Sequence, residues 1–516
     1  MPIRKKHMLK FIDNFLNKTT MYRLVLYVLI FFFGATLVLS IFKFLPYTLI
    51  DLIASVGIIL AMSLIFNVIF SRMYKAPTNV ESVYITALIL FFIITPAQGG
   101  VYSQFVPLAF WASVLAVASK YIFSINKKHI FNPAAFAVLL TAFTINESAS
   151  WWIGTANMLP FVFVGGLLIV RKIRRTDLVV GFFVSAVVTV SALTLLDGSD
   201  LASTLIKILK DSAFFFFAFI MLTEPLTTPP TKWLRVIYGA LVGFLFMSAL
   251  RIGSFYSTPE LALVMGNVFS YLVSPKEKLI LKLKERKKIA ADTFDFVFQK
   301  DKRFSFLPGQ YMEWTLKHRE PDTRGNRRYF TLASSPTEEE IHLGVKFYPE
   351  SSSFKSHLLA LPIGDEIIAS QRAGDFLLPK ESKQDLVFIA GGIGITPFRS
   401  MVQYLLDHQE KRPITLLYSN KTVGDVAYKD IFDRAQTELG IKTVYMITTV
   451  DNAPLSQPMR YGYIDAEVIK AEVPDYKNKL FYISGPRTMV NAFEKMLKAM
   501  GVSSKNIKVD FFPGFA

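Results

Sequence analysis

The stretch DLVFIAGGIGITPFRSMV, residues 385–402, decides the fold of the C-terminal half of this chain. An apolar strand runs directly into a glycine-rich loop, and a helical pattern follows at once. Glycines have no side chain, so the backbone can approach a dinucleotide closely at the point where a helix begins. One such loop is a weak signal when it stands alone. The candidate NAD(P)-binding residues in it are Gly391, Gly392, Gly394, Thr396 and Pro397.

Two further strands support this interpretation. TLLYSN (415–420) ends the next strand, and KLFYISGPRTMV (479–490) ends a later strand before another helix. Strands that alternate with helices predict an α/β domain, which binds nucleotides beyond the carboxyl ends of its strands. The candidates at these two strand ends are Ser419, Asn420, Lys421, Ser484, Gly485 and Pro486.

A second kind of pattern precedes the α/β domain. Short alternating runs from about Lys278 predict a β-barrel. Within it, FLPGQYMEW (306–314) contributes Gln310, and RRYFTLASSP (327–336) places a cation, a ring and a hydroxyl on one strand. This set suits FAD, with Arg328 at the pyrophosphate, Phe330 against the isoalloxazine face and Thr331 near its N5 atom. We expect these three side chains to lie side by side, and Tyr329 is a further candidate for FAD binding.

A predicted helix start in SSSFKSHLLALPIGD (351–365) adds a phosphate site, because the free N–H groups of a first helical turn attract anions. Its candidate residues are Ser353, Lys355 and Ser356.

These motifs, in this order, resemble the ferredoxin–NADP reductase superfamily over Lys278–Ala516. The resemblance implies FAD in the barrel, nicotinamide near Thr396 and Gly485, and adenosine near Ser419–Lys421. Many relatives have Cys-Gly-Pro where this chain has Ser-Gly-Pro. In the C-terminal DFFPGFA, Phe512 or Phe515 would cover the flavin as a terminal ring does in relatives.

The composition of the N-terminal half indicates that lipid, and not water, surrounds it. Hydrophobic residues make up 52% of the 516 residues, 47 of them Phe, and the mean hydropathy is +0.38. Apolar runs fill the chain up to Val273, and about 20 apolar residues cross a bilayer. We expect ten helical segments: 21–41, 51–70, 81–95, 105–123, 132–145, 159–170, 178–196, 213–222, 234–251 and 259–273.

Charge and rare residues restrict the chemistry. The net charge is +17, but Lys and Arg lie mainly beside apolar segments, so we expect membrane topology and no nucleic-acid partner. The chain has no cysteine, and of its six histidines only His129 lies within the membrane region. We therefore expect no iron–sulfur cluster, no haem and no other metal. Basic residues gather in the N-terminal arm and in the even connections, which puts both termini in the cytosol of a prokaryotic inner membrane.

The short apolar segments form a pattern. The third ends in FIITPAQGG (92–100) and the eighth in MLTEPLTTPP (221–230), while the fifth begins in HIFNPAA (129–135) and the tenth around VMGN (264–267). Equivalent interruptions predict two inverted five-helix repeats, in which broken helices line a site. The alternative is that these interruptions have a purely structural role, as proline kinks and helix caps.

This arrangement predicts two flavin sites in the membrane. On the cytosolic side, residues of TEPLTT meet the start of the fifth helix, and on the outer side TPAQ meets the tenth. The first site would contain Asn132, Pro133, Thr223, Glu224, Pro225 and Thr227. The second would contain Thr95, Pro96, Gln98, Gly266 and Asn267.

The motifs HIFNPAA, GGLLIVRKIRR (165–175), FFAFIMLTEPLTTPP (216–230) and ELALVMGN (260–267) resemble the flavin-carrying membrane subunits of the sodium-pumping NADH:quinone reductase and of the Rnf complex. Glu224 stands where that family usually has Asp. Those subunits carry FMN on a threonine of an outer loop, but the corresponding loop here is only NESASWWIGTANM (146–158) and lacks the attachment motif. One or two membrane flavins, FMN or riboflavin, would therefore be held without a covalent bond.

The sequence thus predicts a basic arm (1–20), a ten-helix membrane domain (21–273), an FAD barrel (278–380) and an α/β NAD(P)-binding domain (381–516). The predicted activity is an NAD(P)H dehydrogenase that passes electrons through FAD and membrane flavin to a quinone or an extracytosolic flavoprotein. A redox-driven ion pump or transporter is the alternative, since inverted repeats suit transport. The choice between NADH and NADPH stays open.

Overall fold

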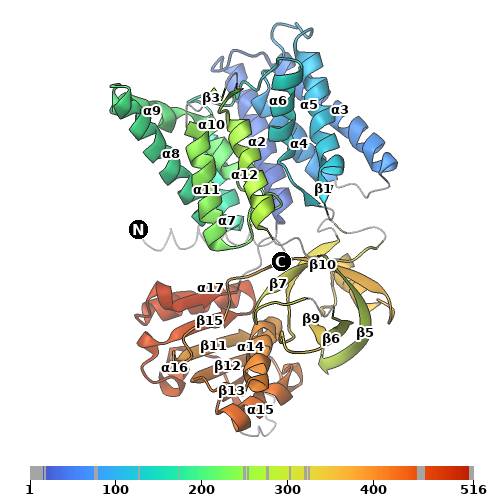
Figure 1. Ribbon diagram of the computed structural model, residues 1–516, viewed down its shortest axis with the longest axis vertical. Coiled ribbons are helices and arrows are strands. Elements are labelled where there is room, and N and C mark those ends of the chain that lie inside the picture. Colours follow the sequence, from blue (N-terminus) through green and yellow to red (C-terminus); the bar gives the residue numbers. More distant parts are fainter. Residues whose placement is uncertain are drawn as a thin grey trace. The chain divides into compact units, whose positions relative to one another are not determined.

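The computed structural model describes residues 16, 19–74, 80–125, 128–173, 175–247, 251–252, 255–274, 278–300, 304–318, 322, 326–449 and 459–510. The chain divides into two compact units, one of which takes in the residues up to Ser274 while the other begins at Pro275. Figure 1 shows the first unit as helices, from blue to green, and the second as sheets with helices, from yellow to red.

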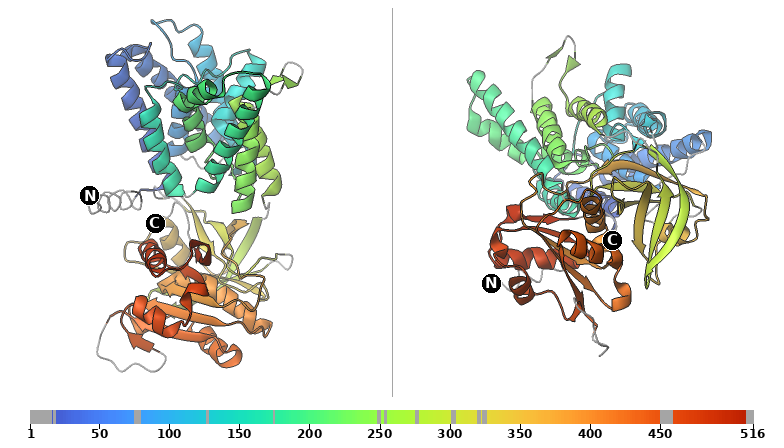
Figure 2. Two further views of the ribbon diagram at one scale, coloured as in Figure 1. Left: turned by 90° about the vertical axis from the view of Figure 1, so that its left-hand side faces the viewer. Right: turned by 60° about the horizontal axis from the view of Figure 1, so that its bottom comes forward.

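The first unit is a bundle of apolar helices packed side by side (Figures 1 and 2). Each of the ten expected segments contains a helix among the described residues. Four helices, α2, α3, α5 and α8, are long and apolar enough to cross a membrane. The bounds are α2 Met21–Ile41, α3 Leu49–Met73, α4 Val80–Ile93, α5 Phe105–Ile122, α6 Pro133–Thr144, α7 Leu159–Ile173, α8 Thr176–Leu196, α9 Leu201–Lys210, α10 Ser212–Phe216, the π-helical turn η1 Phe217–Met221, α11 Lys232–Met247 and α12 Pro259–Val273.

Helix α9 was not expected from the sequence. It has no buried residue and has a polar, lysine-bearing composition, so its apolar run is too short and too interrupted to be read as a crossing. Two short antiparallel pairs complete the unit: β1 Ser124–Ile125 with β2 Lys128–His129, and β3 Arg251–Ile252 with β4 Phe255–Tyr256.

Glycines allow α8 and α11 to approach each other closely. A Cβ atom on Gly239 would lie 2.3 Å from the carbonyl oxygen of Leu178, and one on Gly243 would lie 2.4 Å from that of Phe182. Small residues at such contacts let helix backbones meet in lipid, where the hydrophobic effect does not drive the helices together.

Replacing Gly239 by alanine is therefore expected to destabilise the helical unit by about 1–3 kcal/mol, the usual cost of overpacking. Thermal unfolding in detergent measures the effect. Gly57→Ala in α3 is the matched control, because its Cβ would meet nothing within 4 Å. Equal unfolding midpoints for the two variants would contradict this account of the α8–α11 contact.

The second unit begins with a six-stranded antiparallel sheet in the order β8-β7-β10-β5-β6-β9. Strands β8 and β9 end this order, and the described residues form no ladder between them, so closure of the barrel remains a prediction. The elements are β5 Lys278–Ala290, β6 Thr293–Gln299, β7 Tyr311–Thr315, β8 Arg327–Thr331, β9 Glu340–Lys346, α13 Ser353–Leu359 and β10 Glu366–Ala373.

A parallel sheet in the order β14-β13-β12-β11-β15-β16 follows. Its central strand β11 is wholly buried, because α14 and α15 pack on one face of the sheet and α16 and α17 on the other (Figure 2). The elements are β11 Leu386–Gly391, η2 Gly392–Ile395, α14 Thr396–Asp407, β12 Ile414–Asn420, η3 Val423–Asp425, α15 Lys429–Leu439, β13 Lys442–Ile447, β14 Met459–Tyr461, α16 Ala466–Glu472, η4 Tyr476–Asn478, β15 Leu480–Ser484, α17 Arg487–Ala499, η5 Ser504–Asn506 and β16 Ile507–Val509.

Candidate functional site

The parallel sheet brings the predicted nucleotide residues together at one edge. Gly391 at the end of β11 pairs with Ser419 of β12, and Ala390 pairs with Ser484 of β15. The chain fills the sheet outward from β11 through β12 and β13, and then crosses to the other side of β11 for β15. Open α/β sheets bind their ligands at this reversal of strand order.

The glycines of this edge let two loops touch through their backbones. A Cβ on Gly394 would lie 2.5 Å from the Cα and N atoms of Gly485 and from the carbonyl oxygen of Ser484. Gly485 itself has a φ of +155°, and its own Cβ would lie 3.2 Å from the backbone of Gly391. Any larger residue at Gly394 would separate the loops, so the glycine is required by a close approach.

The helices that follow these loops begin in the expected places. Thr396 is the first residue of α14 with Pro397 directly after it, and Pro486 precedes α17. The Ser484 hydroxyl donates to Oδ2 of Asp510 at 3.1 Å, a partner that the sequence did not suggest. At the end of β12, Asn420 is buried whereas Lys421 is exposed.

Strand β8 separates the predicted flavin residues into two sets. The Arg328 guanidinium lies 5.4 Å from the ring centre of Phe354 in α13, and the Phe330 ring lies 5.9 Å from the same ring. Successive residues of a strand point to opposite faces, so Tyr329 and Thr331 lie on the other face. The expectation that the cation, the ring and the hydroxyl lie side by side is therefore wrong for Thr331. Tyr329 donates to Oε2 of Glu313 at 3.0 Å instead.

The Ser353 N–H at the beginning of α13 and the Arg328 guanidinium together bind an anion, and we call these two groups the cradle. The Ser353 backbone N–H donates to Oδ2 of Asp322 at 3.0 Å, and Nη2 of Arg328 lies 3.5 Å from Oδ1 of the same carboxylate. The Asp322 carboxylate thus stands where the sequence expects a flavin phosphate. Since the two predicted partners converge on a negative charge, they fit the pyrophosphate of FAD.

The described flavin candidates other than Arg328 and Ser353 have other contacts. Lys355 donates through its Nζ atom to the Lys346 carbonyl oxygen at 2.8 Å, so its charge is directed to the end of β9. Gln310 closes the Pro-Gly turn, because its Oε1 accepts from the Leu307 N–H at 2.9 Å. Ser356 lies in the first turn of α13, and Phe512 and Phe515 lie outside the described residues.

Removing the cation of the cradle is expected to weaken FAD binding. Arg328→Met should raise the FAD dissociation constant by roughly 10- to 100-fold, since a hydrogen bond to a charged group contributes about 1.5–3 kcal/mol. Fluorescence of released FAD during dilution measures the constant. Arg327→Met is the control, because the Arg327 guanidinium pairs with Glu313 on the opposite face. Equal losses in both variants would contradict a phosphate role for Arg328.

In the helical unit, one hydrogen-bonded chain links the interrupted segments. The Glu224 carboxylate lies 2.8 Å from Nε2 of His129 and accepts from Nδ2 of Asn132 at 2.9 Å. The Asn132 N–H donates to Oδ1 of Asn267 at 2.8 Å, and Nδ2 of Asn267 donates to the Tyr238 hydroxyl at 3.0 Å. Five residues from several segments of the chain thus form a polar cluster within an apolar bundle. His129 and Tyr238 were not among the predicted site residues.

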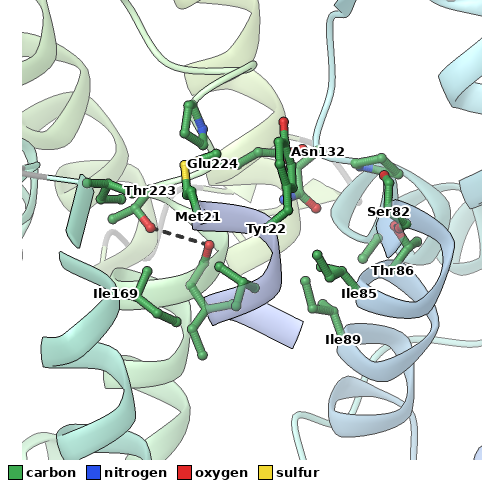
Figure 3. A pocket seen from close by; sticks show the side chains of 16 residues that line it. Met21, Tyr22, Ser82, Ile85, Thr86, Ile89, Asn132, Ile169, Thr223 and Glu224 are labelled. Carbon is green, nitrogen blue, oxygen red and sulfur yellow. Dashed lines mark hydrogen bonds between the residues drawn. The ribbon is translucent and has the colours of Figure 1, made fainter. Parts of the chain in front are cut away.

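A cavity of about 60 Å³ adjoins this cluster. Glu224 and Asn132 lie above the isoleucines Ile85, Ile89 and Ile169 in Figure 3. The volume is enough for only a few waters, and is well below the roughly 300 Å³ at which small-molecule pockets begin. A flavin ring would therefore require neighbouring side chains to move. The other predicted residues of this site that line the cavity are Pro133, Thr223 and Pro225.

Thr227 contacts the Glu224–Asn132 cluster through both its hydroxyl and its backbone carbonyl oxygen. Its hydroxyl donates to the Glu224 carbonyl oxygen at 3.3 Å, and its own carbonyl oxygen accepts from Nδ2 of Asn267 at 3.5 Å. These bonds hold the TEPLTT segment in a turn against α12.

The structure does not bring the residues of the second predicted membrane site together. Helix α12 begins at Pro259 with Thr258 as its cap, not near VMGN, so Asn267 lies eight residues inside the helix and joins Asn132. Gly266 packs beside it, since its Cβ would meet Val242 and Tyr238 of α11.

The TPAQGG segment is held at the start of α3 instead. Oγ of Ser55 accepts from the Ala97 N–H at 2.9 Å, and the Asp51 carboxylate accepts from the N–H groups of Gly99 and Gly100 at 3.3 Å. Thr95, Pro96 and Gln98 therefore belong to a connection that is closed by hydrogen bonds. At this position the structure agrees with the alternative that the interruption is a proline kink.

A larger cavity, of about 210 Å³, lies at the actual start of α12. Its one carboxylate is the buried Glu260, which accepts from Nε1 of Trp151 at 2.5 Å. Trp151 has a φ of +51°, and its backbone N–H and that of Ser150 both donate to the carbonyl oxygen of Ile93, the last residue of α4. Trp151 thus bridges the last residue of α4 and the start of α12, and the sequence did not single out Trp151 or Glu260 as site residues.

Comparison with known proteins assigns both units. Residues 142–278 match the NQR2, RnfD, RnfE family, and residues 388–495 match the oxidoreductase NAD-binding domain. The chain joins these two in one polypeptide. With four helices long enough to span, it is an integral membrane protein.

Individual relatives match the second unit. A flavohemoprotein from Oceanobacillus iheyensis is 28% identical over 244 residues, which is 46% of this chain and 58% of the relative. One subunit of the Na(+)-translocating NADH-quinone reductase from Haemophilus influenzae is 29% identical over 201 residues, 36% of this chain and 48% of the relative. The chain therefore spans about half the length of these relatives.

Among solved structures, the Amycolatopsis cytochrome P450 reductase GcoB is 23% identical with a TM-score of 0.41, and the match covers 46% of this chain and 70% of that one. The flavohemoglobin from Malassezia yamatoensis is 17% identical with a TM-score of 0.43, over 69% of this chain and 98% of that one.

Proposed function

We propose that this protein is a membrane NAD(P)H dehydrogenase, in which hydride from NADH or NADPH reaches FAD in the second unit and electrons pass on to the helical unit. The observation that carries this proposal is the contact of the Gly391–Thr396 loop with Ser484 and Gly485 at the switch point of the parallel sheet. The fit of Arg328 and Ser353 around an anion supports FAD as the partner.

The residues of the second unit bind and position rather than transfer protons. When bound, FAD supplies the hydride acceptor and can release electrons singly. The glycine loop and the Ser484–Pro486 turn would hold the nicotinamide ring, and Arg328 with the start of α13 would hold the flavin phosphates. Phe330, packed on Phe354, offers an apolar surface to the flavin ring.

We further propose a noncovalent flavin, FMN or riboflavin, in the helical unit. The Glu224–Asn132 cluster and the Glu260 cavity lie at the starts of α6 and α12, which would occupy equivalent places in the two five-helix halves proposed from the sequence. Two inverted halves of five crossings each, with both termini in the cytosol of a prokaryote, would carry electrons across the roughly 30 Å hydrocarbon layer. The acceptor would be a quinone or an extracytosolic flavoprotein.

Anaerobic titration of the purified protein tests the proposal. NADH or NADPH is added stepwise, the flavin absorbance is followed, and total flavin is extracted and identified. We expect FAD plus one or two further flavins per chain, released without proteolysis and all reducible by the nicotinamide. A protein that contains FAD alone would remove flavin from the helical unit, and FAD that stays oxidised would overturn the dehydrogenase.

A second candidate is a redox-driven ion pump, which the partly buried Glu224 carboxylate and its partner His129 favour. Ionisable side chains inside a membrane bundle often mark ion or proton pathways. Proteoliposomes would take up sodium ions or protons during turnover if the chain pumps, and an uncoupled dehydrogenase would show neither.

A further inference from the structure

The segment that follows the flavin strand is tied to the helix that follows the nicotinamide loop. Oγ of Ser400 donates to the Ser334 carbonyl oxygen at 2.6 Å, and Nη1 of Arg399 donates to the Ala333 carbonyl oxygen at 3.1 Å. Both side chains are buried, and both lie in the first turn and a half of α14, which begins at Thr396. Ala333 is two residues beyond Thr331, the last residue of β8.

A carboxylate fixes the arginine in this place. Nη2 of Arg399 pairs with Oε1 of Glu338 at 2.8 Å, and Nη1 pairs with Oε2. The same Glu338 carboxylate accepts from the Ser335 N–H, so one acid holds both the arginine and the segment that the arginine binds. Burial opposes the Arg399 cation, but Glu338 outweighs that effect and raises the pKa of the guanidinium above its ordinary value.

A second layer of contacts supports the pair. The Arg399 guanidinium lies 5.5 Å from the Tyr428 ring centre, and the Tyr428 hydroxyl donates to Oδ1 of Asp295 at 3.1 Å. Oδ2 of Asp295 lies 2.6 Å from Nδ1 of His342. Tyr428 has a φ of +57°, a conformation that costs about 1–3 kcal/mol for a residue with a side chain and that its surroundings must enforce.

The glycine loop lies directly on the antiparallel sheet at this point. A Cβ on Gly344 of β9 would lie 2.8 Å from Cγ2 of Thr396 and 2.6 Å from the Tyr428 hydroxyl. The antiparallel sheet and the parallel-sheet part are therefore held together both by side chains packed against Gly344 and by buried polar bonds.

We propose that Arg399 and Ser400 are positioning residues that set the separation between the flavin strand β8 and the nicotinamide loop 391–396. The inference rests on the proposed dehydrogenase function. Hydride transfer needs the two reacting rings held at contact distance, and a misplacement of 1 Å can slow a reaction about 100-fold. Neither side chain touches the reacting atoms, and their effect passes through the Ala333–Ser334 backbone on one side and α14 on the other.

Two variants of the full-length protein test the proposal. Ser400→Ala removes one tie with almost no change of volume. The double variant Arg399→Met/Glu338→Met removes the other tie and both charges of this largely buried pair together, because replacing a buried ion pair by apolar residues usually preserves stability, whereas removing one partner does not. Gly424→Ala is the control, since its Cβ would meet only Oγ1 of Thr422, at 3.9 Å.

Four measurements separate positioning from folding: single-turnover reduction of bound FAD by NADH and NADPH, the nicotinamide dissociation constant, the thermal midpoint, and amide hydrogen exchange of residues 332–336 and 391–398 without nicotinamide. We expect each variant to transfer hydride about 10- to 100-fold more slowly. The dissociation constant and the thermal midpoint should stay near those of the wild type, and exchange should rise in both segments.

The proposal is overturned if either variant reduces FAD at the wild-type rate, or if the rate falls only together with the thermal midpoint or FAD content. It is also overturned if exchange in the two segments is unchanged. A wild-type protein whose FAD is not reduced by nicotinamide would instead overturn the proposed function, so the two failures are distinguishable.

Discussion

Gly394→Ala is expected to slow the reduction of bound FAD by NAD(P)H at least about 100-fold while leaving FAD content unchanged. A methyl group at this position would lie 2.5 Å from the backbone of Gly485 and from the Ser484 carbonyl oxygen. Both neighbours are main-chain atoms and cannot move aside as a flexible side chain can. The two loops must separate, and a misplacement of 1 Å is enough for an effect of this size.

Stopped-flow measurement of the flavin absorbance after mixing with NADH or NADPH gives the rate. Gly424→Ala is again the control, because it adds the same methyl group to a loop of the same sheet that has room for it. If Gly394→Ala reduces its FAD as fast as this control, the nicotinamide does not bind between the two loops.

The second large effect is expected at Glu224 in the helical unit. Its carboxylate is shared by His129 and Asn132, and Asn132 also caps α6. Glu224→Ala leaves the amide of Asn132 and the ring of His129 without this partner, and each lost bond to a charged group costs about 1.5–3 kcal/mol. We expect the membrane flavin to be lost, with onward electron transfer falling about 100-fold.

Reduction of ferricyanide measures electron transfer as far as FAD, because ferricyanide takes electrons directly from FAD. In Glu224→Ala the rate of ferricyanide reduction should equal that of the wild type. Glu81→Gln is the control acid, because Glu81 forms a half-exposed ion pair with Arg23 at 3.0 Å and is not one of the residues that line the cavity beside Glu224. Equal quinone reduction by Glu224→Ala and by Glu81→Gln would show that Glu224 does not serve the electron path.

Local patterns allowed much of this protein to be predicted. The strand, the glycine loop and Thr396 form a continuous stretch, so their arrangement follows from chain geometry alone. The ends of α2 also follow from hydropathy, because Met21–Ile41 is a single apolar run. In each case the residues that fix the structure are neighbours in sequence.

Predictions failed where distant residues decide the structure. The predicted segment 259–273 has the start that Thr258 and Pro259 give α12, but the interpretation of VMGN as a helix start put Asn267 in the outer site, whereas it bonds Asn132, 135 residues away in sequence. Arg399 and Glu338 are separated by 61 residues, and nothing in either neighbourhood indicates the pair. The anion cradle likewise depends on Asp322 and Ser353, which only the folded chain brings together.

The most direct test of the account is electron transfer across a sealed membrane. Purified protein is reconstituted into liposomes that contain ferricyanide or a soluble flavin only in the lumen, and NADH or NADPH is added outside. Impermeability is checked with protein-free vesicles, and a second sample contains quinone in the lipid. We expect nicotinamide oxidation coupled to reduction of the enclosed acceptor or of the quinone, and abolished by Gly394→Ala and Glu224→Ala. Oxidation of nicotinamide with neither acceptor reduced would contradict an electron path through the helical unit.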